Sequence, residues 1–146
     1  MSRGVYRNKN YDGEDGTADK LKDLFGGNGT YAHVLSFAAY IGLEHQKKTP
    51  LKISDRNGDA VDLTIFDKQR LTSHVYSIPF IGMGYDVQAI IDGDKSVETF
   101  ESYANAGMKI IHKLIQDHPT DTNGAETIIS LVREMHSENM KAINKA

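Results

Sequence analysis

The fold is decided by the stretch Thr99-Phe100-Glu101-Ser102-Tyr103-Ala104-Asn105-Ala106-Gly107-Met108-Lys109-Ile110-Ile111. Its spacing predicts a helix over about 97–117, capped by Ser96, with an apolar stripe through Phe100 and Ile111. The small residues Ala104 and Gly107 lie on that stripe between bulky ones, so another backbone can approach closely. No nucleophile, metal-ligand set or acid–base pair is present in the stretch. The pattern therefore favours a binding or assembly module over an enzyme.

A second helix is predicted over about 31–43, and it is apolar on nearly every side, as a central core helix is. Its small residues Ala38, Ala39 and Gly42, like Ala104 and Gly107 of the first stretch, are expected in the tightly packed interior. Apolar spacing predicts further helices over about 18–25, 67–78, 85–92 and 124–143. Pro79 is expected to end the helix at 67–78, because proline lacks the N–H that a helix interior requires.

The pattern changes period between the helices at about 51–66. Leu51 and Ile53 alternate with polar residues, Asn57-Gly58 is a strong hairpin turn, and apolar residues alternate again from Val61. This stretch predicts a β-hairpin. The expected fold class is mainly α (α+β), a compact helical domain with one small hairpin, and the order of elements also fits a winged-helix-like layout.

The length of 146 residues indicates one domain with one core. Residues 1–16 are polar and glycine-containing, so they predict a flexible N-terminal arm, and residues 17–146 form the single helical domain. The chain has no cysteine and no apolar run of the roughly 20 residues that a membrane span requires. We therefore expect a cytoplasmic protein without membrane contact.

The net charge of −3 is not that of a protein that coats nucleic acid without specificity. Basic residues nevertheless gather beside and within the predicted hairpin, and the N-terminal arm could add to the same surface. This pattern predicts a local patch that contacts DNA phosphates. The candidate nucleic-acid-binding residues are Lys47, Lys48, Lys52, Arg56, Arg3 and Arg7.

No catalytic residue, metal site or cofactor is predicted. The six histidines show no pairing at metal-ligand spacing. One alternative stays open, in which Asp55, Asp59 and Asp62 supply carboxylate ligands for a small metal-dependent nuclease or hydrolase subunit. A second alternative is a structural adaptor that oligomerises through its last helix.

Two segments resemble a known family. Phe37-Ala38-Ala39-Tyr40-Ile41-Gly42-Leu43, followed by Lys47-Lys48-Thr49-Pro50-Leu51, is similar to the "FAA-x-x-G, then basic residues and Pro-Leu" segment of the small Dnd system-associated proteins. The segment Phe100–Met108 resembles the same family's "FEEYANGGL". With the Ile65-Phe66-Asp67 junction, the resemblance spans about 30–115.

These proteins are encoded beside bacterial DNA phosphorothioation genes. The resemblance implies a non-enzymatic accessory or regulatory role in a modification–restriction system that defends against phage. It implies other proteins of that system as partners, with DNA and a second copy of the chain as further candidates. The family has no catalytic motif to transfer to this sequence.

Overall fold

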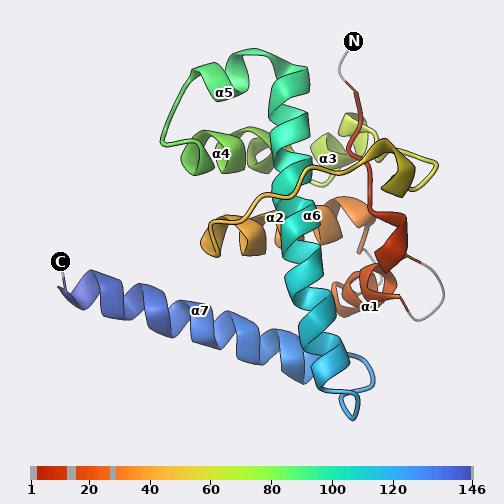
Figure 1. Cartoon of the computed structure of the whole chain (residues 1–146), viewed down its shortest axis with the longest axis vertical. Helices are drawn as coiled ribbons and strands as arrows, with labels where there is room; N and C mark the ends of the chain where they lie inside the picture. Colours follow the sequence, from red (N-terminus) through yellow and green to blue (C-terminus); the bar gives the residue numbers. More distant parts are fainter. Residues whose placement is uncertain (1–2, 13–15, 27–28, 146) are drawn as a thin grey trace.

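The computed structural model describes residues 3–12, 16–26 and 29–145. Over these residues the chain forms seven α-helices and two short 3-10 helices, without a β-sheet (Figure 1). In chain order the elements are η1 (Lys9–Tyr11), α1 (Thr17–Leu24), α2 (Tyr31–Glu44), η2 (Ile53–Asp55), α3 (Leu63–Lys68), α4 (Thr72–Gly82), α5 (Gln88–Ile91), α6 (Gly93–Asp117) and α7 (Ala125–Lys145).

The central element is α6, which contacts α1, α2, α4, α5 and α7 (Figure 1). It crosses α2 at small residues. A Cβ atom added to Gly107 would lie 1.7 Å from the carbonyl oxygen of Ala38, and one added to Gly42 would lie 2.2 Å from the carbonyl oxygen of Tyr103. Only glycine fits at such distances, so the predicted close approach at Ala104 and Gly107 is confirmed.

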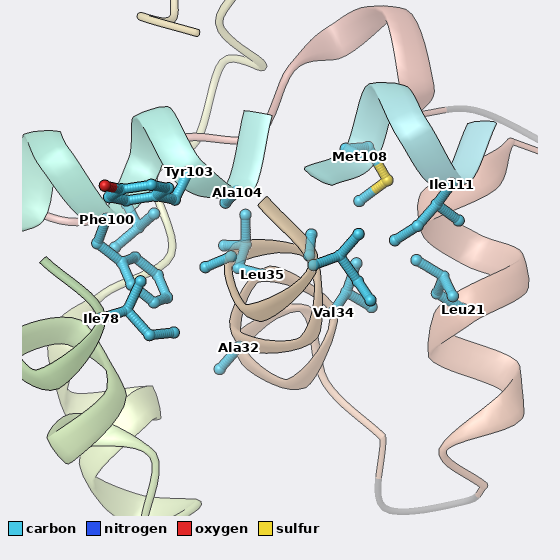
Figure 2. Close-up of a cluster of buried hydrophobic side chains, with 14 of the residues drawn as sticks. Leu21, Ala32, Val34, Leu35, Ile78, Phe100, Tyr103, Ala104, Met108 and Ile111 are labelled. Atoms are coloured by element: carbon cyan, nitrogen blue, oxygen red, sulfur yellow. The ribbon is translucent and has the colours of Figure 1, made fainter. Parts of the chain in front are cut away.

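The core surrounds α2 on several sides. Figure 2 shows α2 nearly end-on, with α6 side chains above it, Leu21 of α1 on one side and Ile78 of α4 on the other. Phe100 of α6 and Phe66 of α3 are both fully buried, and their rings meet edge to face with centroids 5.8 Å apart. The helix α2 is apolar on most sides because α1, α4 and α6 pack around it, and Tyr40 remains 41% exposed.

The predicted hairpin at 51–66, and the winged-helix-like layout with it, are wrong. The first half contains η2, and the second half runs into α3, which Asp62 caps by accepting the Thr64 N–H at 2.9 Å. The alternation of Leu63 and Ile65 with polar residues is typical of a strand. In the structure the same stretch is a short helix that buries Phe66 in the core.

The two halves do not pair with each other because the N-terminal arm takes their backbone hydrogen bonds. Val5 and Val61 exchange N–H···O bonds of 2.9 and 2.7 Å, and the Asn57 N–H donates to the Arg7 carbonyl at 2.8 Å. Two isolated antiparallel bridges result, Val5 with Val61 and Asn8 with Arg56. Val5 is fully buried, so the arm contributes a core residue.

The prediction that Pro79 ends its helix is also wrong, because α4 continues to Gly82. Proline has no N–H to donate to the carbonyl four residues earlier, which here belongs to Val75. The hydroxyl of the fully buried Ser96 donates to that carbonyl at 2.8 Å instead. Ser96 lies inside the first turn of α6 and is not the cap that the sequence predicts. Asp92 caps the helix by accepting the Asp94 N–H at 3.0 Å.

The last predicted helix is confirmed as α7, which extends away from the other helices (Figure 1). Near its start, the N–H and the hydroxyl of Thr127 donate to Asp121 at 2.7 and 2.8 Å. These bonds hold the pKa of the Asp121 carboxyl below its usual value. Leu131 and Met135 are buried on the face of α7 that belongs to the core.

Replacing Gly107 by alanine should destabilise the domain strongly, because the new methyl group would overlap the backbone of α2. We expect a loss of about 3 kcal/mol in the free energy of unfolding, measured by urea denaturation. The control is Gly58→Ala, since nothing lies within 4 Å of a Cβ there. It should change stability by less than about 0.5 kcal/mol. Equal stability of the two variants would contradict the close helix crossing.

Candidate functional site

The basic residues of the strap, defined as residues 45–52, lie across α6 (Figure 1). Two hydrogen bonds hold the strap to the helix. The Thr49 N–H donates to the Ser102 carbonyl at 3.0 Å, and the Asn105 side-chain amide donates to the Thr49 carbonyl at 3.0 Å. Three predicted DNA-binding residues are exposed on it, namely Lys47, Lys48 and Lys52.

Lys48 also touches the neighbouring surface. Its Nζ lies 3.1 Å from Sδ of Met83 and 5.9 Å from the centroid of the Tyr103 ring. Lys48 and Tyr103 border a cavity of about 530 Å³ between the ends of α2 and α4. The other residues in its wall are Leu43, Glu44, Gln46, Ile81, Gly82 and Gly84. Burial raises the pKa of the Tyr103 phenol. The strap is therefore continuous with the surface around α4.

The three predicted arginines make contacts within the protein. The guanidinium carbons of Arg56 and Arg3 lie 4.4 and 5.8 Å from the centroid of the Tyr6 ring. Arg7 pairs with Asp12 at 2.9 Å and covers the ring of Tyr31 at 3.7 Å. The structure thus brings Arg3 and Arg56 together, as the sequence suggested, but around an aromatic ring.

A residue that the sequence reasoning missed, Glu101, fastens the arm to α6. It is only 3% exposed and accepts hydrogen bonds from the Arg3 guanidinium and from the Tyr6 N–H, the latter at 2.8 Å. The signal was present in the sequence, because Glu101 stands among the apolar Val97, Phe100 and Ala104 of the same helix. A carboxylate on an apolar helix face requires a cationic or N–H partner.

Large apolar side chains are exposed around the turn from α4 to α5. We name Ile81, Met83, Tyr85, Val87 and Ile91 the α4–α5 patch, and their exposed fractions are 43, 41, 68, 54 and 65%. The backbone of Tyr85 has a φ of +61°, a left-handed conformation that is costly for a bulky residue. The turn therefore keeps an aromatic side chain on the outside of the molecule.

The alternative metal site is not assembled in the described part of the chain. Among those residues no three or more His, Asp or Glu side chains lie together as a metal ion requires. Of the candidates Asp55, Asp59 and Asp62, the last serves as the cap of α3. Within the same ranges, none of the helices is both long enough and apolar enough for a bilayer span.

Comparison with known families gives a match over most of the chain. The model of the family described as DNA sulphur modification system-associated protein 4 matches residues 17–145. No curated protein and no solved structure matches the chain. Since the match covers most of the sequence, the chain belongs to this family, and the resemblance to Dnd-associated proteins is confirmed.

Replacing Glu101 by glutamine should loosen the arm, because the charge that attracts Arg3 is lost while the size of the side chain is kept. We expect faster trypsin cleavage after Arg7 and faster hydrogen exchange of the Tyr6 amide. Glu98→Gln, one turn earlier on α6 and exposed, is the matched control and should behave as the wild type. Equal cleavage rates in both variants would show that Glu101 does not anchor the arm.

Proposed function

We propose that this family member is a non-enzymatic accessory or regulatory protein of a DNA sulphur modification–restriction system, in which it binds another protein of that system. The family match supplies the system. The α4–α5 patch supplies the observation that carries the proposal. Exposed apolar side chains of this number within residues 81–91 are typical of interaction sites, and tyrosine and methionine are enriched in interface cores.

The position of the basic strap supports the same surface. Because Nζ of Lys48 lies 3.1 Å from Sδ of Met83, the strap borders the apolar patch at Lys48. An apolar centre with a charged rim is the usual arrangement of a protein interface. The proposed partner therefore presents an apolar surface bordered by acidic residues.

The main test is co-purification with the proteins of the same sulphur modification system. The double variant Val87→Asp with Ile91→Asp should abolish co-purification, because two carboxylates would be buried without partners. Ile53→Asp is the control, since Ile53 is 78% exposed on η2, outside the patch, and it should bind as the wild type does. Retained binding in the double variant would remove the patch from the proposal. Turnover of a substrate by the homogeneous protein would contradict a non-enzymatic role.

DNA is the second candidate partner, and the observation in its favour is the group of three exposed lysines on the strap. Changing Lys47, Lys48 and Lys52 to glutamate should lower duplex affinity at least tenfold at low salt and reduce its salt dependence, because fewer counterions are released on binding. Fluorescence anisotropy over a salt series measures both effects.

The control for the DNA test carries the same change of charge at three exposed lysines outside the strap, Lys68, Lys95 and Lys109. If both triple variants lose affinity equally, the effect is one of net charge and the strap is not a DNA site.

A further inference from the structure

The extended helix α7 carries an apolar stripe that the rest of the domain does not cover. Ile129, Val132, Met140 and Ile143 are 48, 44, 43 and 65% exposed. Successive residues of an α-helix turn by about 100°, which places these four side chains and the exposed His136 on one side of the helix. Leu131 and Met135, which pack on the core, are on a neighbouring side.

The stripe is symmetrical about His136. Val132 and Met140 stand four residues before and after it, and Ile129 and Ile143 stand seven residues before and after it. Such a pattern is complementary to itself when two copies of the helix run antiparallel about a twofold axis. Ile129 of one copy then meets Ile143 of the other, and Val132 meets Met140.

We propose that a second copy of this chain covers the stripe, in an antiparallel α7–α7 dimer whose twofold axis passes beside His136. An interface of this kind is isologous, so one patch serves both copies. The inference goes beyond the proposed function and does not rest on it, because the α4–α5 patch and the strap take no part in this contact.

The charges on α7 fit the antiparallel pairing. Glu126 and Arg133 border the stripe, whereas Glu134, Glu138 and Lys141 point to the opposite side by the same helical geometry. A twofold rotation about an axis at His136 places Glu126 of one copy beside Asn144 of the second copy. The same rotation places Arg133 beside Ser137 of the second copy, so no like charges are opposed. The stripe itself contains no Asp, Glu, Lys or Arg residue, and His136 stands at its centre.

The length of α7 limits the size of the contact. The helix α7 is about 30 Å long, at about 1.5 Å per residue. One pair of such helices makes an interface at the small end of the usual range, below about 1,200 Å². The dimer should therefore exchange with monomer at micromolar concentrations, which sedimentation velocity can follow over a concentration series.

Point variants test the stripe in the full-length protein. Val132→Glu should weaken dimerisation at least about 100-fold, since it buries a carboxylate in the contact. Ser130→Glu places the same charge on another side of α7 and should leave the dimer unchanged. His136→Leu should strengthen it about tenfold by completing the apolar stripe. Far-UV circular dichroism checks that each variant remains folded. A wild-type protein that stays monomeric at all concentrations overturns the proposal, and so does equal weakening by the two glutamates.

Cysteine pairing tests the direction and the register, because the chain has no cysteine of its own. Disulfides form where Cα atoms lie about 4.4–6.8 Å apart. Under copper phenanthroline oxidation, His136→Cys should cross-link to itself. Ile129→Cys should not cross-link to itself but should do so when mixed with Ile143→Cys. Self-linking of Ile129→Cys would indicate a parallel pair and overturn the proposed dimer.

Discussion

The close approach of the α2 and α6 backbones is the constraint on which the rest of the structure depends. With Gly107 against the Ala38 carbonyl and Gly42 against the Tyr103 carbonyl, no side chain separates the two helices where they cross. The bulky residues on either side of the crossing, such as Phe100 and Ile111, then reach around α2 and meet side chains from α1, α3 and α4. One long helix can therefore organise a small domain that has no sheet in its described residues.

A buried carboxylate extends this organisation to the N-terminal arm. Glu101 requires partners because it stands on an apolar face, and the Arg3 guanidinium and the Tyr6 N–H supply them. The arm so held reaches the residues that resembled a hairpin and takes their backbone hydrogen bonds. The same contacts divide the predicted basic residues into two groups. The arginines stabilise the arm through Tyr6, Tyr31 and Asp12, and the lysines of the strap remain exposed.

Because the arginines make contacts within the protein, we propose protein contact before DNA contact for this member of the DNA sulphur modification system-associated protein 4 family. The three arginines among the six predicted DNA-binding residues contact other groups of the protein. The α4–α5 patch, in contrast, has five large apolar side chains exposed to solvent. The apolar stripe of α7 adds a second surface on a different part of the molecule. In the proposed role, two separate surfaces would allow the protein to bind a second copy and another component at the same time.

The sequence by itself determined the helices α2, α6 and α7, the small residues at the crossing, and the family. Those features follow from local periodicity and short motifs. A helix face repeats every three to four residues, and apolar residues on that face indicate that it is buried. Only the tertiary structure determined the conformation of residues 51–66, the continuation of α4 past Pro79 and the groups that the arginines contact. In each case the deciding group is distant in the sequence: Val5 for Val61, Ser96 for the carbonyl that Pro79 leaves without a donor, and Tyr6 for Arg56. A local pattern shows that a backbone or a charge needs a partner, but only the folded chain determines which group supplies it.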